Sequence, residues 1–298
     1  MASASLQDLP GARGRYAIFG RIFIYAILLL FVGYYLLPMV VMISTSLKSA
    51  AEIRTGSLIS LPREITFDAW GEAWGKACTG AACNGLAPFF WNSIVMAVPA
   101  VMISTILGAL NGYALTKWRF RGANLLFGLI LFGSFIPFQL ILLPMSQTLG
   151  WLGIAGTTPG LVLVHVVYGL SFTTLFFRNY YITIPDDLVK AATIDGAGFF
   201  QIFFKIMLPL STPIVMVTVI WQFTQIWNDF LFGVSFATST ASAPVTVALN
   251  NLVNTTTGVK RYNVDMAAAM IAALPTLLIY ILAGKYFVRG LTAGSVKG

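Results

Sequence analysis

The sequence is poor in charged residues and poorer still in histidine and cysteine. Only 9% of its 298 residues are Asp, Glu, Lys or Arg, whereas 58% are hydrophobic. Soluble domains carry roughly 25% charged residues, so this composition excludes an ordinary soluble protein and points to a membrane. With one histidine and two cysteines in the whole chain, little material is available for a metal site or a catalytic triad.

The single histidine, His165, lies in an apolar run. Ser171 is six residues further on, which is the opposite side of a helix, so the two do not form a Ser/His pair. No His, Cys and carboxylate cluster has the spacing of metal ligands. A buried histidine that is bonded within a helix bundle or faces a cavity is the better interpretation.

A phosphate-binding loop is also missing. Such a loop needs Gly-Lys followed by Ser or Thr after a strand, but the pairs at 75–76 and 284–285 are followed by Ala77 and Tyr286. We therefore expect no enzymatic activity, no cofactor and no metal on this chain. Any energy for its work must come from another chain.

What the sequence has in abundance is long apolar runs. About 20 apolar residues are needed to cross a bilayer, and in lipid such runs must be helical because every backbone polar group has to be satisfied internally. The runs are continuous rather than alternating, which excludes a β-barrel. We predict an all-α polytopic protein with six transmembrane helices, at Ile22–Ile43, Trp91–Leu115, Leu125–Met145, Pro159–Phe177, Ile206–Phe230 and Met266–Val288.

The chain is thus expected to divide into a terminal segment (1–21), a transmembrane domain (22–288) and a short tail (289–298). Of the 18 Lys and Arg residues, twelve fall in both termini, the loop 117–121 and the region 178–205. Positive charge favours the cytoplasmic side, so we expect both termini inside. The net charge of +8 mostly reflects this bias, and a nucleic-acid partner is not expected.

Cys78 and Cys83 then fall in an outer loop, "ACTGAACNG". Two cysteines that face an oxidising compartment can form a disulfide that constrains such a loop. The alternative is a pair of free thiols in a mobile loop. In either case the cysteines are expected to be structural.

The fifth apolar run carries a polar stripe. Its members follow an i, i+4, i+7, i+11 spacing and share one helix face: Thr218, Gln222, Gln225 and Asp229. Trp221 and Trp227 lie on other faces. Polar residues are costly in a membrane and often line a pathway, and amides with aromatic rings suit a sugar. Interhelical hydrogen bonds are the alternative, and for Asp229 a cap or salt bridge. The pathway candidates are Gln222, Gln225, Asn228 and Asp229.

The second run contains small residues at four-residue spacing, Ser104, Gly108 and Gly112. Stripes of this kind let two helices approach closely in lipid. We predict a packing surface there rather than a ligand site.

The stretch "IPDDLVKAATIDGAGFFQIFFKIMLP" (184–209) connects the fourth and fifth runs. Pro185 followed by Asp186 and Asp187 favours a helix start, because proline suits the first turn and acids suit the positive end of the helix dipole. Gly196 and Gly198 would permit a reversal of the chain, after which an aromatic helix follows. The segment is either a bracket for a cytoplasmic partner or a plain connector.

"AATIDGA" with the later Leu208-Pro209 resembles the EAA motif of ATP-binding-cassette importer permeases, Glu-Ala-Ala-x-x-Asp-Gly-Ala. In that family the motif forms a coupling helix, here within the loop 184–208, that docks into the ATPase subunit. This sequence departs from the motif at its first position, where Lys190 replaces the usual Glu. The positions that correspond to the motif are Lys190, Ala191, Ala192, Asp195, Gly196 and Ala197.

Three further stretches, "STSLK", "WNDFL" and "FVRGLTAGSVKG", resemble carbohydrate-type importer permeases. The chain is similar to the smaller permease of the maltose system and to permeases assigned to glucose or mannose uptake in Gram-negative bacteria. The resemblance implies a second homologous permease, two ATPase subunits that hold ATP and Mg²⁺, a periplasmic sugar-binding protein and a place in the bacterial inner membrane. It also implies that the loop near Asn250–Lys260 contacts the binding protein and that Arg289–Gly298 reaches the ATPases.

Two other functions fit the sequence less well. A secondary transporter that uses an ion gradient would need a carboxylate near the membrane midplane, and Asp229, the candidate, lies near the outer end of its run. A membrane-embedded hydrolase would need a nucleophile and a base that the sequence does not pair. The sequence favours an importer permease.

Overall fold

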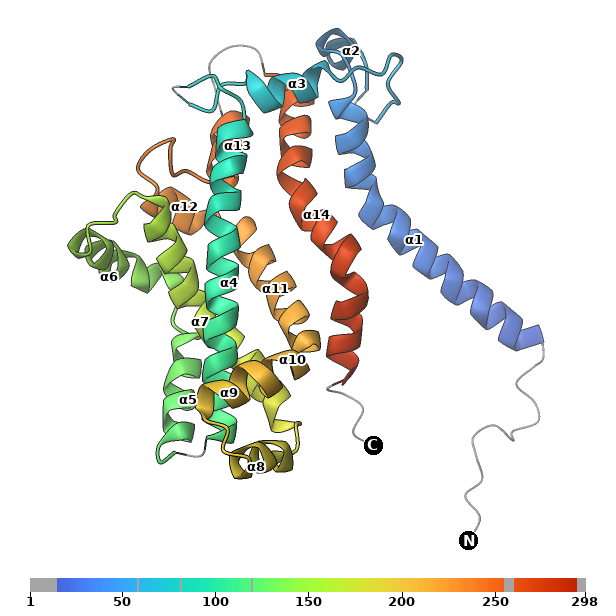
Figure 1. The fold of residues 1–298 in the computed structure, drawn as a ribbon. Helices are drawn as coiled ribbons and strands as arrows, with labels where there is room; N and C mark the ends of the chain where they lie inside the picture. The colour runs from blue at the N-terminus through green and yellow to red at the C-terminus, as the bar shows by residue number, and fades with distance from the viewer. Residues whose placement is uncertain (1–14, 58, 81, 119, 255–259, 294–298) are drawn as a thin grey trace. The chain divides into compact units, whose positions relative to one another are not determined.

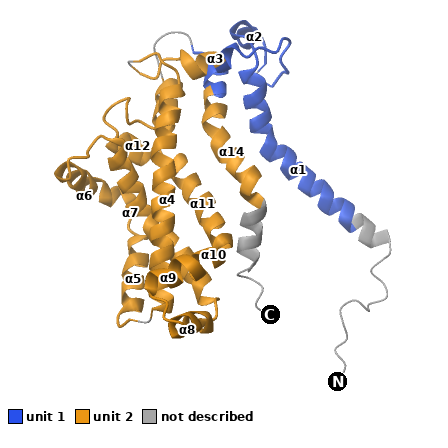
Figure 2. Cartoon of the chain, in the orientation of Figure 1, with its two compact units in different colours: residues 1–70, 260–267 blue, residues 71–259, 268–298 orange. Residues whose placement is uncertain are grey.

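The computed structural model describes residues 15–57, 59–80, 82–118, 120–254 and 260–293. Over these residues the chain forms helices and no strands, which confirms the predicted all-α fold. It divides into two compact units, one of residues 1–70 with 260–267 and one of 71–259 with 268–298 (Figure 2). Residues 1–14 and 294–298 of the predicted terminal segments lie outside the described residues.

The first unit contains α1 (Arg15–Ser46) and α2 (Ala50–Thr55). Residues Gly20–Ser46 of α1 are long and apolar enough to cross a membrane. Large apolar side chains along α1 are exposed, among them Leu29, Leu30 and Tyr35. Such a surface is suited to lipid rather than to water.

The "STSLK" stretch ends α1 and organises the segment after it. The Lys48 side chain is buried, and its Nζ donates hydrogen bonds to the Ser57 carbonyl at 3.1 Å and the Ser60 hydroxyl at 3.2 Å. Asn263 Nδ2 donates to the Lys48 carbonyl at 3.2 Å, and the Thr66 N–H donates to the Leu47 carbonyl at 3.0 Å. This stretch therefore holds the end of α1 to the later segments of the first unit by hydrogen bonds.

The second unit is built on α4 (Ala87–Lys117) and α7 (Thr158–Ile182), which lie side by side (Figure 1). Their backbones are very close. A Cβ at Gly108 would lie 2.5 Å from Thr173 Cβ, and one at Gly112 would lie 2.7 Å from Phe177 Cβ. The small-residue stripe is thus confirmed as a packing surface.

The third predicted span is not one helix. It is a pair, α5 (Ala123–Gly133) and α6 (Phe138–Trp151), bent by 100°, so the prediction of a continuous helix over Leu125–Met145 is wrong. Pro137 is the cause, because it lacks an N–H and disfavours helical backbone at Ile136. With 11 residues, α5 reaches only about half the bilayer core of roughly 30 Å.

The fifth predicted span is also broken, so Ile206–Phe230 is not one helix. The chain forms α9 (Phe199–Ile202), the π-helical turn η1 (Phe203–Met207) and α10 (Leu208–Leu210), and then bends by 79° into α11 (Thr212–Trp227).

Pro213 causes the second break, because it cannot donate to the Pro209 carbonyl. That carbonyl accepts from Thr212 Oγ1 at 2.9 Å instead. Tyr180 Oη donates to the Leu210 carbonyl at 2.8 Å, and Ser211 Oγ donates to the Met207 carbonyl. The carbonyls freed at the bend are therefore satisfied by hydroxyl groups.

The remaining helices are short except the last. They are α3 (Asp68–Gly75), α8 (Asp186–Ile194), α12 (Leu231–Phe236), α13 (Val245–Val253) and α14 (Tyr262–Ala293). Among the described residues, four helices could each cross a membrane, or six spans exist if each bent pair counts as one.

Segments that the sequence assigns to opposite membrane faces lie at opposite ends of α4 (Figure 1). Near its start, Ser93 Oγ accepts from the N–H of Val245, the first residue of α13, at 2.8 Å. Near its end, the Tyr113 ring packs on Phe199 of α9 with ring centroids 4.8 Å apart. A segment predicted on the outer side thus lies at one end of α4, and a segment predicted on the inner side lies at the other end.

Candidate functional site

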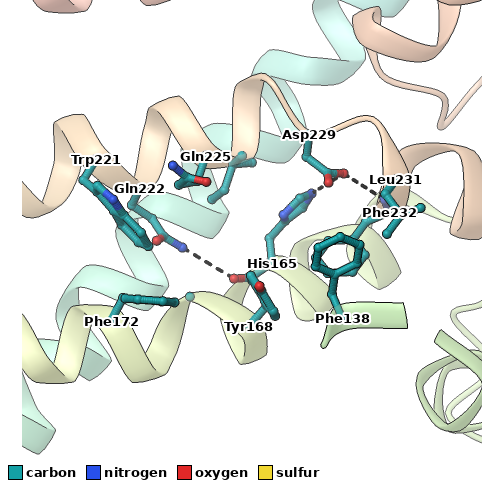
Figure 3. A pocket seen from close by; sticks show the side chains of 12 residues that line it. Phe138, His165, Tyr168, Phe172, Trp221, Gln222, Gln225, Asp229, Leu231 and Phe232 are labelled. Atoms are coloured by element: carbon teal, nitrogen blue, oxygen red, sulfur yellow. Dashed lines mark hydrogen bonds and ion pairs between the residues drawn. The ribbon is translucent and has the colours of Figure 1, made fainter. Parts of the chain in front are cut away.

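A cavity of about 240 Å³ lies between α7 and α11 in the second unit (Figure 3). We call it the α7–α11 cavity. Its walls come from α6, α7, α11, α12 and the turn before α12. The lining residues are Phe138, His165, Tyr168, Gly169, Phe172, Trp221, Gln222, Gln225, Ile226, Asp229, Leu231 and Phe232.

Gln222 is the most deeply placed polar side chain of this cavity. It is 1% exposed, and its Nε2 points to the His165 carbonyl at 3.5 Å (Figure 3). Its Oε1 is buried with no hydrogen-bond partner among the described residues. A buried acceptor without a partner is costly, so this amide is suited to accept from a hydroxyl group that enters the cavity.

Aromatic rings form the rest of the wall. Trp221 packs between Phe172 and Phe176, with ring centroids 4.9 and 5.3 Å away. Phe232 makes edge contacts with His165 and Tyr168 at 5.5 and 5.4 Å. Apolar rings with a few polar groups are typical of a small-molecule site, and rings can cover the apolar faces of a sugar.

Asp229 both lines the cavity and caps a helix. Its Oδ2 accepts from the backbone N–H groups of Phe232 at 3.0 Å and Gly233 at 3.2 Å, at the start of α12. His165 Nε2 lies 3.9 Å from the same Oδ2, which is too far for a direct hydrogen bond. The carboxylate is therefore held mainly by backbone donors.

The remaining pathway candidate, Asn228, does not line this cavity. Asn228 turns toward α14, where its Nδ2 donates to Thr276 Oγ1 at 3.3 Å as well as to the Thr224 carbonyl at 2.9 Å. Trp227 is buried, and its Nε1 donates to the Ala272 carbonyl at 2.8 Å. "WNDFL" is thus a corner that joins α11, α12 and α14.

The second candidate site is α8, which begins at Asp186 after Pro185 as predicted. Lys117, at the end of α4, is the anchor of this start: its Nζ lies 2.7 Å from Asp186 Oδ1 and also donates to the Ile184 carbonyl. The Lys117 side chain is only 3% exposed. The anchor fixes α8 to the end of α4.

One side of α8 is buried in an aromatic cluster. Val189 and Ala192 pack there, and Ala197 lies against it. Ala192 is only 8% exposed, so it holds the helix in place and is not on the free face with Ala191. The other buried members of the cluster are Ala109, Tyr113, Phe177, Tyr181, Ile184, Ile202, Phe203 and Met207.

The other side of α8 is open. Ile194 is 86% exposed and Leu188 is 45% exposed, and Ala191 and Asp195 are exposed beside them. Lys190 pairs with Asp187 at 3.0 Å across an exposed turn. A groove of about 660 Å³ runs between this side and the end of α4. Leu188, Ala191 and Ile194 follow one another at three-residue spacing and form one exposed apolar patch, and such a patch marks a surface suited to a protein partner.

The chain reverses after α8 at one glycine rather than two. Gly196 has φ +82°, which favours glycine, whereas Gly198 has φ −79°. The predicted role of Gly198 in the reversal is therefore wrong. Gly198 instead is the N-cap residue that precedes α9, and its N–H donates to Gln201 Oε1 at 3.1 Å.

A family model described as "Binding-protein-dependent transport system inner membrane component" matches residues 100–292. This match covers both the α7–α11 cavity and α8. The chain belongs to this family.

Curated relatives of this transport component cover most of its length. A "Probable ABC transporter permease protein" of Pyrococcus horikoshii is 41% identical over 93% of the chain and 98% of the relative. The "Xylose/arabinose import permease protein" of Haloferax volcanii is 32% identical over 91% and 92%. The trehalose transport system permease protein SugB of Mycobacterium tuberculosis is 31% identical over 90% and 95%.

A solved structure shares the fold of this transport component. It is a bacterial ABC transporter involved in the import of the acidic polysaccharide alginate, and the match has a TM-score of 0.80 at 24% identity, over 94% of this chain and 100% of the other. The family and this match establish an ABC importer permease fold.

Of the residues that line the cavity of this permease, His165 was expected to be bonded within the bundle or to face a cavity, whereas Tyr168, Gly169 and Phe172 were not predicted. His165, Tyr168, Gly169 and Phe172 follow an i, i+3, i+4, i+7 spacing and share one face of α7. That pattern was the available signal, because it sets polar and aromatic groups beside a glycine. Trp221 was placed off the polar stripe, yet it lines the cavity beside Gln222.

The two cysteines of the permease are joined in a disulfide, Cys78–Cys83. The two cysteines are five residues apart in sequence, and their bond closes a loop between α3 and α4. Neither cysteine lines the α7–α11 cavity. Among the described residues, no three His, Cys, Asp or Glu side chains gather as a metal site would require.

Proposed function

We propose that this chain is the inner-membrane permease subunit of an ATP-driven importer for sugars. The observation that carries the proposal is the architecture of α8. One side of the helix is fixed by Lys117 and the aromatic cluster, and the other presents Ile194 to a partner. Such a helix can transmit a displacement without deforming.

The proposed assembly follows from the family. A second, homologous permease would enclose the pathway with this chain, and two cytoplasmic ATPase subunits would bind and hydrolyse ATP with Mg²⁺. A periplasmic binding protein would deliver the sugar. A related solved structure, of the alginate transporter with its periplasmic protein bound to an alginate pentasaccharide, supports the last partner.

The sugar class is supported by two observations. The relatives' names include xylose/arabinose, trehalose and diacetylchitobiose, and the α7–α11 cavity combines an amide with aromatic rings. Its volume of about 240 Å³ lies below the roughly 300–1,000 Å³ of pockets for drug-sized ligands. This volume, together with the resemblance of the sequence to glucose and mannose permeases, leads us to favour a monosaccharide such as one of these hexoses.

In the proposed mechanism, closure of the ATPases moves α8. Motif residues on its free side and in the turn after it, Lys190, Ala191, Asp195 and Gly196, would meet the ATPase, while Ala192 and Ala197 hold the helix to α4 and α7. The bend at Ser211 continues from this region into α11, which carries Gln222 and Gln225. Movement of α8 would therefore reach the cavity, and the second permease would hold most of the sugar contacts.

The proposed orientation places both termini and α8 in the cytoplasm of a bacterium. The Lys and Arg bias of the loops supports it, and so does the placement of α8 and α13 at opposite ends of α4. The disulfide loop at 78–83 would then face the oxidising side.

The test is co-purification in mild detergent, scored for an ATPase subunit. Ile194→Arg alters a side chain that is 86% exposed, and Ile59→Arg, at a side chain that is 73% exposed, is the matched control. We expect the ATPase to accompany the intact chain and the control but not Ile194→Arg. If no ATPase accompanies the intact chain, α8 is a plain connector and the proposal fails.

A second measurement concerns energy and substrate. In proteoliposomes that hold the purified complex and binding protein, uptake of labelled glucose, mannose, xylose and trehalose is followed with ATP or with an ion gradient alone. We expect ATP-dependent uptake with a hexose preferred. Uptake driven by the gradient without ATP would favour a secondary transporter.

A further inference from the structure

A second hollow, of about 510 Å³, lies where the end of α4, the start of α5, the end of α7 and the first residue of α8 meet. We call it the basic hollow. It shares no lining residue with the α7–α11 cavity. Its lining residues are Leu115, Thr116, Lys117, Phe120, Arg121, Ala123, Asn124, Arg178, Ile182 and Asp186.

The hollow has a surplus of positive charge. Lys117 and Asp186 form an ion pair at 2.7 Å, so their charges largely cancel. Arg121 and Arg178 add two cations to the wall, and Asn124 adds amide hydrogens. An anion that enters would meet two guanidinium groups, and guanidinium is well suited to bind phosphate.

Arg178 is held in position for such a ligand. Its Cζ lies 4.0 Å from the centroid of the Phe127 ring, which fixes the plane of the guanidinium group. Its Nε is buried and has no hydrogen-bond partner among the described residues. The guanidinium group is therefore held by the ring and not by a hydrogen bond from Nε to a described residue, and guanidinium is well suited to bind phosphate.

The surroundings of the hollow are apolar and suited to lipid. On α5, which begins at its edge, Leu125, Leu129 and Phe132 are 70%, 61% and 66% exposed. A free inorganic anion would make no use of this apolar wall.

We propose that the basic hollow binds the phosphate of an anionic phospholipid, with the acyl chains lying along α5. Basic pockets between membrane helices on the cytoplasmic side are suited to such headgroups. The inference rests on the proposed function in one respect only, which is that the hollow would face the inner leaflet of the membrane.

The test uses the intact importer in nanodiscs that contain equal parts of phosphatidylglycerol and phosphatidylcholine. The lipid that remains bound after extraction into detergent is counted by native mass spectrometry. The variant is Arg121→Gln with Arg178→Gln, and the charge-matched control is Arg54→Gln with Arg63→Gln, two exposed arginines of the first unit. Arg121→Gln alone covers the case in which the double variant fails to fold.

We expect retained phosphatidylglycerol to fall about fivefold for each arginine removed, and the control to match the parent. Equal retention by Arg121→Gln and the control overturns the proposal. Displacement of the lipid by millimolar inorganic phosphate overturns the lipid assignment and indicates a free-anion site. Retention of lipid with loss of the ATPase subunit would show that the hollow contacts a protein instead. Because ATPase co-purification is scored separately, failure here is distinct from failure of the proposed function.

Discussion

Gly169 of α7 lies directly against the side-chain amide of Gln222 on α11. A Cβ at Gly169 would come within 1.9 Å of Gln222 Nε2. The absence of a side chain at 169 is therefore what allows this amide to lie buried beside the His165 carbonyl. This one glycine thus makes room for the buried amide that lines the α7–α11 cavity.

The first prediction is that Gly169→Ala displaces Gln222. Overpacking of this kind costs about 1–3 kcal/mol, and the displaced amide would enter the cavity. We expect a lower unfolding temperature and slower sugar uptake, measured on the purified complex. Gly150→Ala on α6 is the control, because no atom lies within 4 Å of its added Cβ.

A rescue variant separates this clash from other effects of the extra methyl group. Gly169→Ala combined with Gln222→Ala removes the side chain that the Cβ would meet. We expect the double variant to recover part of the lost stability, as a positive coupling in a double-mutant cycle. Strictly additive effects would contradict the contact.

The second prediction concerns two neighbouring polar residues with different roles. Gln225 is exposed in the cavity wall, whereas Asn228 is bonded to Thr276 of α14. If the second permease holds most of the sugar contacts, Gln225→Ala raises the KM of uptake by less than about fivefold, the value of one hydrogen bond. Asn228→Ala lowers the unfolding temperature and leaves KM unchanged.

Uptake kinetics and thermal unfolding of both variants provide the check. A KM increase far above fivefold for Gln225→Ala, or for Gln222→Ala, would place the main sugar contacts on this chain. A change in KM for Asn228→Ala without loss of stability would show that Asn228 acts in sugar uptake and that its bond to Thr276 does not stabilise the fold.

The third prediction concerns the disulfide. In membranes under non-reducing conditions, a maleimide-linked polymer should not shift the protein on a gel, because Cys78 and Cys83 are bonded to one another. After reduction, two polymers should attach. Cys78→Ser with Cys83→Ser should cost about 2 kcal/mol of stability, the expectation for so short a loop, while uptake persists. Labelling without reductant would contradict the bond.

Hydropathy was enough to place four of the spans, because α1, α4, α7 and α14 are continuous helices over the predicted runs. It could not reveal the breaks at Pro137 and Pro213. Proline is tolerated inside membrane helices when neighbours satisfy the freed carbonyls, and Pro99 and Pro275 do lie inside helices here. The Tyr180 hydroxyl that satisfies a carbonyl at the Pro213 bend comes from α7, so the fifth apolar run alone does not reveal it.

The same reason limits what the sequence could say of the sites. The spacing of Gln222, Gln225 and Asp229 placed them on one face, and all three line one cavity. The spacing could not identify α7 as the opposite wall, since the close approach at Gly169 is a tertiary contact. On α8, the motif identified the residues but not the side of the helix on which each one lies. That Ala192 packs against the core is a tertiary contact, which the motif does not specify.

The fourth prediction tests the anchor of α8. Lys117→Met removes a cation that is 3% exposed and leaves Asp186, whose side chain is 36% exposed, without that partner at 2.7 Å. A hydrogen bond to a charged group contributes about 1.5–3 kcal/mol, and partial exposure places this one at the lower end. Because the anchor joins α8 to α4, we expect uptake to fall more than ATPase binding.

Asp187→Asn is the matched control, since Asp187 pairs with Lys190 across a surface where both side chains are exposed and such pairs contribute about 0–1 kcal/mol. Uptake per ATP hydrolysed, measured in proteoliposomes, distinguishes the two. If this ratio falls for Lys117→Met and does not change for Asp187→Asn, α8 transmits force through its buried anchor. If the two variants give equal ratios, the aromatic cluster alone is sufficient to transmit force from α8.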